Sequence, residues 1–277
     1  WCTKEGGDKV GFGVCEGKVL PAISNLGTPA HANICRSDSK KDNYSHFKLY
    51  GHWKSSSAWR VRTAMAAKAI PYESIPVNFL EGEHKSDAHS RRNSMMQIPV
   101  LEFVNTGSGE TVRITQSMAI IEFLEEMFPN RGGTLFPADP IDRAAAREAA
   151  EIVNSGIQPL QNLPILNMID SGREGREGLT GKDFGKLAIE KGLFALEAMV
   201  GKQRNSKGKG CGPYALGTFS PTLADVFIVP QLCNARRFCV DVESLCPTLL
   251  AAEAAAAQHA WFKESSPKEQ PDHPSSM

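Results

Sequence analysis

The sequence lacks the features that mark several classes of protein. Lys and Arg total 31, as do Asp and Glu, so the formal net charge is zero and the basic excess of a nucleic-acid-binding protein is missing. No apolar run approaches the roughly 20 residues that cross a membrane. The seven cysteines include no CxxC pair and no histidine at zinc-ligand spacing, so neither a metal site nor a disulfide framework is indicated. We therefore expect a cytoplasmic protein that binds no nucleic acid, membrane or metal.

The two ends of the chain lack the apolar periodicity of packed elements. Residues 1–45 are rich in Gly, Lys, Asp and Ser and have no continuous apolar core of a secretory signal, while their acidic residues weaken the case for a transit peptide. Residues 263–277 contain three prolines and several serines. We expect the first segment to be a disordered extension and the last to be a disordered tail.

Between these ends, the first part of the chain alternates strands and helices. Strands are predicted at 47–51, 72–78, 97–103 and 111–115. One helix is predicted at about 57–69, between the first two strands, and another follows Ser117 as its N-cap. The order β-α-β and then β-β-α predicts a thioredoxin-like domain over residues 46–129.

The second part of the chain shows helical patterns only. It follows a linker rich in Pro and Gly. Helices are predicted at 141–168, 182–200, 222–238 and 247–262. Pro159 should bend the first of them, and Thr222 with Asp225 has the spacing of a structural capping box. The sequence thus predicts an α/β domain followed by an all-helical domain over residues 137–262.

Three serines, Ser55 to Ser57, stand where the first strand leads into the first helix. The start of a helix leaves backbone N–H groups without partners and carries a partial positive charge, so it attracts anions, thiolates included. A hydroxyl such as that of Ser55 adds a further donor. Taken alone, the serines are better explained as a helix N-cap than as an anion site.

The stretch from Trp53 to Arg62, WKSSSAWRVR, resembles the S-S-C-x-W-R-V-R signature of the zeta-class glutathione transferases, the maleylacetoacetate isomerases, with Ser57 in place of the family's cysteine. The layout of a thioredoxin-like domain and a helical domain is also that of this superfamily. The resemblance extends to four further stretches, at residues 97–99, 116–117, 155–163 and 229–238.

The resemblance implies a role for each matched position. Ser55 is implied to be catalytic by stabilising the glutathione thiolate, and Arg237 to receive a carboxylate of the substrate. Ile98 is implied to pair its backbone with the cysteinyl part of glutathione, which requires a cis peptide bond before Pro99. The residues implied to bind glutathione are Ser56, Ser57, Trp59, Arg60, His84, Ile98, Gln116, Ser117, Gln158, Asn162, Leu163 and Pro164.

The function implied is the glutathione-dependent isomerisation of maleylacetoacetate to fumarylacetoacetate in tyrosine and phenylalanine catabolism. Glutathione is the implied cofactor, a small diacid the substrate, and a homodimer the implied assembly. Transfer of glutathione and dehalogenation of α-halo acids are implied side activities.

Several alternatives remain open at this point. A hydroxyl is a poorer nucleophile than a thiolate, so Ser57 also suits a general conjugating transferase or a non-catalytic glutathione-binding module. Gln158 and Asn162 could merely satisfy backbone groups around Pro159. Arg237 could be a surface salt-bridge residue, and its neighbour Arg236 complicates the assignment.

Overall fold

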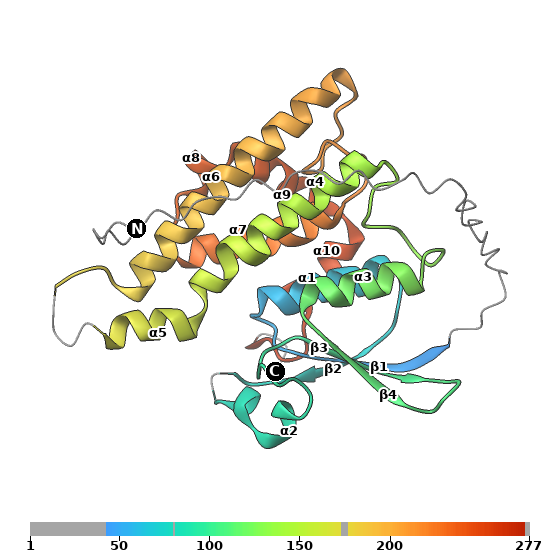
Figure 1. Ribbon diagram of the computed structural model, residues 1–277. Coiled ribbons are helices and arrows are strands. Elements are labelled where there is room, and N and C mark those ends of the chain that lie inside the picture. The colour runs from blue at the N-terminus through green and yellow to red at the C-terminus, as the bar shows by residue number, and fades with distance from the viewer. Residues whose placement is uncertain (1–42, 80, 173–176, 275–277) are drawn as a thin grey trace, which may run out of the picture. The chain divides into compact units, whose positions relative to one another are not determined.

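The computed structural model describes residues 43–79, 81–172 and 177–274 (Figure 1). The predicted disordered extension lies outside these residues except at its last positions. There the prediction is wrong, because Tyr44 and Ser45 belong to the first strand. Tyr44 pairs with Asn105 of a neighbouring strand, and its ring meets that of Phe103 edge-on with centroids 5.1 Å apart.

Four strands form one sheet in the order β2-β1-β3-β4. Their bounds are β1 Tyr44–Gly51, β2 Glu73–Pro76, β3 Val100–Asn105 and β4 Thr111–Thr115. β1 runs parallel to β2 and antiparallel to β3, and β3 runs antiparallel to β4. Leu49 lies opposite Leu101, and both are buried. Directly opposite residues of neighbouring strands point to the same face of the sheet, which here is the face that meets the core. The predicted thioredoxin-like sheet is confirmed.

Two helices cover one face of this sheet (Figure 1). They are α1 Ser56–Ala67 and α3 Ser117–Met127. Val61 and Met65 of α1 and Ile120 and Leu124 of α3 are buried in the same core. The short elements η1 Glu83–Lys85 and α2 Asp87–Ser90 lie between β2 and β3 in the sequence. The β1–α1 turn, which carries the three serines, is thus fixed between the sheet and a packed helix.

The remainder of the described chain is helical. Its elements are α4 Pro140–Glu151, the π-helix η2 Ile152–Ile157, η3 Gln158–Gln161, α5 Leu163–Ser171, α6 Gly181–Lys207, η4 Gly208–Gly210, α7 Leu223–Arg237, α8 Val242–Leu245, α9 Pro247–Gln258, α10 Ala260–Ser265 and η5 Pro267–Glu269. The single helix predicted at 141–168 is therefore wrong. It divides into α4, η2, η3 and α5, since Pro159 has no N–H to continue the regular ladder.

Helix α7 lies at the centre of the helical part, and nearly all of its side chains are buried. Its N-terminus confirms the predicted capping box. The carboxylate of Asp225 accepts the backbone N–H of Thr222 at 2.8 Å, and it also accepts the N–H of Ala215 at 2.8 Å. Asp225 therefore joins the start of the helix to the loop before it.

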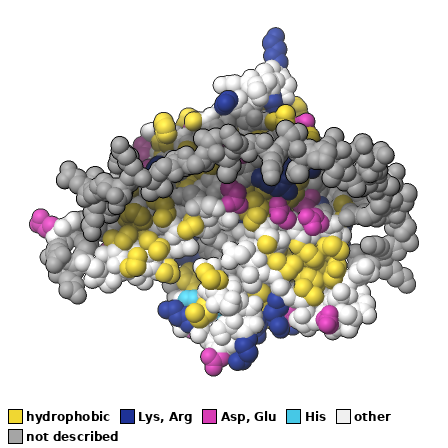
Figure 2. All heavy atoms as spheres, in the orientation of Figure 1, with side chains coloured by type: hydrophobic (Ala, Val, Ile, Leu, Met, Phe, Trp, Pro, Cys, Tyr) yellow, Lys and Arg dark blue, Asp and Glu magenta, His cyan; other side chains and the backbone are white. Residues whose placement is uncertain are grey.

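Helix α6 buries only some of its apolar residues. Leu187 and Phe194 are 55% and 67% exposed, while Ile189 and Leu193 are fully buried. Figure 2 shows apolar side chains gathered over α5 and over the region of α3 and β4 on the face in view. Within the described ranges, no helix has both the length and the apolar character needed to cross a bilayer.

The C-terminal residues are ordered against α1, so the prediction of a disordered tail at 263–277 is wrong for 263–274. Ser265 is 2% exposed and Gln270 is 4% exposed. The Nε of Arg62 donates to the carbonyl of Ser265 at 3.0 Å, and the Oγ of Thr63 lies 2.8 Å from the Oγ of Ser265. Buried donors in α1 hold this segment despite its prolines.

Candidate active site

Ser55 is the N-cap of α1 and also keeps a donor for a ligand. Its Oγ accepts the N–H of Ala58 at 3.2 Å, and its carbonyl accepts the N–H of Trp59 at 2.9 Å. An accepting hydroxyl still has its own proton to donate. Among the hydrogen bonds of the described residues, the N–H groups of Ser56 and Ser57 have no acceptor. The N-cap alternative is therefore realised and is compatible with anion binding at the same helix end.

A second helix N-terminus suited to anions begins at Ser117. Gln116, before it, has φ 70, a conformation that non-glycine residues adopt rarely. Ser117 is 5% exposed, and the Nη1 of Arg60 lies 3.5 Å from its Oγ. A buried positive charge therefore lies directly behind the start of α3.

Arg60 itself is completely buried. Its guanidinium lies 4.3 Å from the ring centroid of Phe227, and Nη1 also approaches the Oδ1 of Asn154 at 3.4 Å. Nε and Nη2 have no hydrogen-bond partner among the described residues. Burial lowers the pKa of Arg60 to about 9. No part of Arg60 reaches the surface, so its charge lies behind Ser117 at the start of α3.

The bond between Ile98 and Pro99 is cis, as the resemblance requires. The carbonyl of the preceding Gln97 accepts the Nδ2 of Asn93 at 2.8 Å and lies 2.9 Å from the Nε2 of His89. These two buried side chains, which the sequence patterns did not reveal, fix the backbone just before Ile98.

The π-helix at 152–157 brings the helical part of the chain to α1. Asn154 lies within this π-helix and its Oδ1 accepts from Arg60. Gln158, the first residue after the π-helix, donates from Nε2 to the Oγ of Ser57. π-turns occur often at functional sites because they redirect side chains. Gln158 therefore has a role beyond the bend at Pro159, since it contacts the implied site.

Arg237 and Arg236 differ in their surroundings. Arg236 forms a paired contact with the carboxylate of Glu253, at 2.7 and 2.6 Å. Arg237 donates to the carbonyl of Lys54 at 3.1 Å and to the Oδ1 of Asn234 at 3.2 Å. The surface salt bridge thus belongs to Arg236, and Arg237 lies exposed beside the residue that precedes Ser55.

None of the side chains of the other implied residues, all of which the structure describes, hydrogen-bonds to Ser55. Leu163 and Pro164 are exposed at the start of α5, and Asn162 caps that helix without a side-chain bond. His84 lies in η1, where burial lowers its pKa. The indole Nε1 of Trp59 donates to the Oγ of Ser265 at 3.1 Å.

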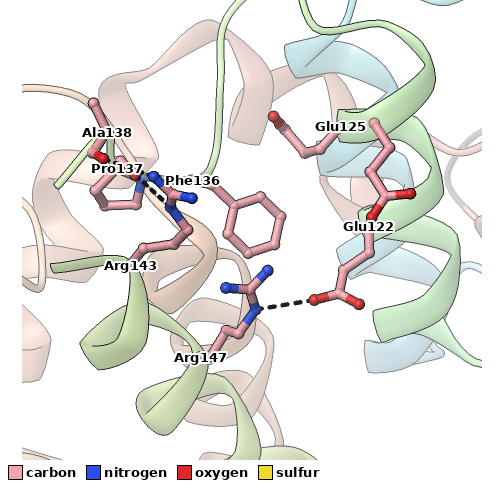
Figure 3. Close-up of a pocket in the computed structure, with 8 residues that line it drawn as sticks. Glu122, Glu125, Phe136, Pro137, Ala138, Arg143 and Arg147 are labelled. Atoms are coloured by element: carbon pink, nitrogen blue, oxygen red, sulfur yellow. Dashed lines mark hydrogen bonds and ion pairs between the residues drawn. The ribbon is translucent and has the colours of Figure 1, made fainter. Parts of the chain in front are cut away.

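A separate cavity of about 310 Å³ lies between α3 and α4 (Figure 3). Its walls are Glu122, Glu125, Glu126, Phe136, Pro137, Ala138, Arg143 and Arg147. Arg147 pairs with Glu122 at 3.0 Å, and Arg143 points toward the carbonyls of Pro137 and Ala138. None of the residues implied to bind glutathione lines it. Over the described part of the chain, no cluster of His, Cys, Asp and Glu could hold a metal.

Comparison with known proteins decides the family. Residues 45–126 match the family model "Glutathione S-transferase, N-terminal domain". The maleylacetoacetate isomerase of Rattus norvegicus is 36% identical over 83% of this chain and 96% of its own length. The chain belongs to the maleylacetoacetate isomerase family.

Members of this family and of the zeta class share its fold. A maleylacetoacetate isomerase from Anaeromyxobacter dehalogenans, solved with glutathione bound in its active site, is 41% identical with a TM-score of 0.71, over 84% of this chain and 100% of its own. The holo structure of a zeta-class maleylpyruvate isomerase is 34% identical with a TM-score of 0.69, over 81% and 99%. This maleylacetoacetate isomerase family member is an enzyme, and its relatives support an isomerase function.

Proposed function

We propose that this enzyme catalyses the glutathione-dependent cis–trans isomerisation of maleylacetoacetate to fumarylacetoacetate. The observation that carries the proposal is the position of Arg237 beside the helix end that Ser55 caps. The hydroxyl and the first N–H groups of α1 suit a thiolate, and the exposed guanidinium suits a carboxylate. The names of the relatives support this substrate.

The residues present fit glutathione. Ser55 and the start of α1 would hold its sulfur, the backbone of Ile98 its cysteinyl part, and Gln116 with Ser117 its γ-glutamyl carboxylate. The buried positive charge of Arg60, whose Nη1 lies 3.5 Å from the Oγ of Ser117, favours an anion bound at the start of α3. Bound there, glutathione supplies a thiolate that adds reversibly to the double bond of the substrate.

The side chains of the enzyme then have three tasks. Ser55 and the N-terminus of α1 lower the pKa of the bound thiol by favouring its anion. Arg237 orients the substrate by one carboxylate. Gln158 ties the π-helix to α1 through the Oγ of Ser57, which keeps the helical part in place over the site. Since the sulfur belongs to the cofactor, the enzyme can act with a serine at position 57.

The test is an assay of maleylacetoacetate isomerisation with and without glutathione, with identification of the product. We expect fumarylacetoacetate, a strict need for glutathione, and regeneration of the cofactor. Ser55→Ala should lower kcat/KM by about 10² to 10³, as the loss of one oriented donor does elsewhere. Ser108→Ala, in the exposed β3–β4 turn, is the matched control and should leave activity unchanged.

Other products decide between the alternatives. A glutathione adduct would assign a conjugating transferase, and an inactive wild type that still binds glutathione would assign a binding module. The wider context is part of the same proposal, namely tyrosine and phenylalanine catabolism, a cytoplasmic homodimer, and dehalogenation of α-halo acids as a side activity. Light scattering after gel filtration tests the homodimer.

A further inference from the structure

The turn that carries Ser55 has two internal bonds, from the N–H groups of Ser55 and Lys54 to the carbonyl and Nδ1 of His52, and it is also anchored by side chains from outside it. We call residues 52–55 the Ser55 loop. Arg62 donates from Nη1 to the carbonyl of His52 at 3.4 Å and from Nη2 to the carbonyl of Trp53 at 3.3 Å. The N–H of Trp53 donates to the Oδ2 of Asp272 at 2.9 Å. The direction of the Ser55 hydroxyl therefore depends on Arg62 and on the C-terminal segment.

Arg62 is itself positioned by the C-terminal segment. Its side chain is buried, and its Nε donates to the carbonyl of Ser265 at 3.0 Å. One planar guanidinium thus joins three carbonyl oxygens, two in the Ser55 loop and one in the C-terminal segment. Burial lowers the pKa of Arg62 to about 10, so the group stays charged at neutral pH.

The C-terminal segment also contacts the first turns of α1. The Oγ of buried Ser265 accepts the indole N–H of Trp59 at 3.1 Å and lies 2.8 Å from the Oγ of Thr63. Further along, the ring of His273 meets that of Trp53 edge-on, with centroids 4.6 Å apart. Figure 1 shows α10, which ends at Ser265, next to α1. The segment therefore fixes both sides of Ser55, the loop before it and the helix after it.

We propose that Asp272 and Ser265 are positioning residues for the reaction, which orient the Ser55 hydroxyl by fixing the Ser55 loop and the first turn of α1. The proposal rests on the function proposed above. A displacement of about 1 Å in a catalytic group can lower the rate about 10²-fold, so the loss of one anchor should be measurable. The charged and titratable groups around the loop are Lys54, Arg62, Arg237, His52 and His273, and Asp272 is the carboxylate that accepts the N–H of Trp53.

The sign of one measurement separates positioning from simple charge. A nearby carboxylate opposes a thiolate, so removing Asp272 as a charge alone would lower the pKa of bound glutathione's thiol. Removing it as an anchor turns the Ser55 donor away and raises that pKa. Asp272→Asn discharges the side chain and keeps an acceptor for the Trp53 N–H, whereas Asp272→Ala removes both.

The experiment titrates the ultraviolet absorption of bound glutathione's thiolate and measures kcat and KM for each full-length variant. For Asp272→Ala we expect a thiol pKa raised by about one unit, kcat lowered about tenfold, and little change in KM for the diacid. Asp272→Asn should restore most of kcat. Ser265→Ala should change kcat in the same direction. Asp241→Ala also removes a carboxylate that accepts a backbone N–H, that of Ser244 in α8, and it should behave as the wild type.

The outcomes are distinguishable. If wild-type enzyme shows no bound thiolate or no isomerisation, the proposed function fails. If the wild type shows both, and Asp272→Ala leaves kcat unchanged or lowers the thiol pKa, the positioning role is refuted and the proposed function stands. Thermal unfolding of each variant confirms that the compared proteins are folded.

Discussion

Replacing Arg60 by methionine should stabilise the fold and impair ligand binding. Arg60 is fully buried beneath Ser117, and two of its nitrogens have no acceptor among the described residues. Methionine has a similar length and no charge to bury. Glu151, whose charge partly offsets that of Arg60, is exposed and keeps its hydration when Arg60 is removed.

The size of the effect follows from the burial of the charge. The pKa of Arg60 is lowered from 12.5 to about 9, and one unit corresponds to about 1.4 kcal/mol, so burying the charge costs about 5 kcal/mol. The whole cost applies at pH 7, because that pH lies below both values. The substitution loses the contact with Phe227, worth about 2 kcal/mol when desolvated, and two long hydrogen bonds worth about 1 kcal/mol together. We expect a net gain of about 2 kcal/mol in the free energy of unfolding.

Urea unfolding at pH 7 measures this gain as a rise of about 0.7 M in the midpoint, for a slope of about 3 kcal/mol/M. Arg62→Met is the matched control with the opposite sign, because it removes three charge-assisted hydrogen bonds worth about 6 kcal/mol together against about 3.5 kcal/mol of relieved burial, and should lose about 2.5 kcal/mol. The same Arg60→Met enzyme should show KM for glutathione raised about tenfold. A midpoint lower than that of the wild type would refute the reasoning, since the buried charge would then be stabilising without a ligand.

Two further predictions concern Asp225 and Ser57. Burial raises the pKa of Asp225 from 3.8 to about 6, so its protonated form contributes stability that is lost as the pH rises through 6. Between pH 4.5 and 7 the free energy of unfolding of the wild type should fall by about 2 kcal/mol relative to that of Asp225→Asn. Equal pH profiles of the two proteins would contradict this. Ser57→Cys should raise turnover of maleylacetoacetate severalfold by restoring the family residue, whereas an inactive wild type rescued by cysteine would show that the protein must supply its own thiol.

Local patterns predicted the elements whose signals lie within a few residues. The strand before Ser55, the helix after it and the capping box of Asp225 each depend on neighbouring side chains, and each is found in the structure. The buried face of α6 was not predictable in the same way. Its exposed Leu187 and Phe194 carry the same apolar signal as its buried residues, so the sequence could not tell them apart.

The site shows the same limit at longer range. Residues 53–62 located the helix end, but the contacts of Ser265 and Asp272 join positions more than 200 residues apart in the sequence. Prolines and serines near the C-terminus gave a disorder signal, and buried donors in α1 override it. The π-helix could not be predicted for a related reason, because no particular residue type marks a turn with one extra residue.

That π-helix sets the direction in which the residues directly after it point. Successive residues of an ordinary helix differ by about 100° around its axis, and a π-turn accommodates one more residue than an α-turn does. A chain one residue shorter between Glu151 and Gln158 would therefore present a different side chain to Ser57. The length of this turn is thus as specific a requirement as the identity of the residues that face the ligand.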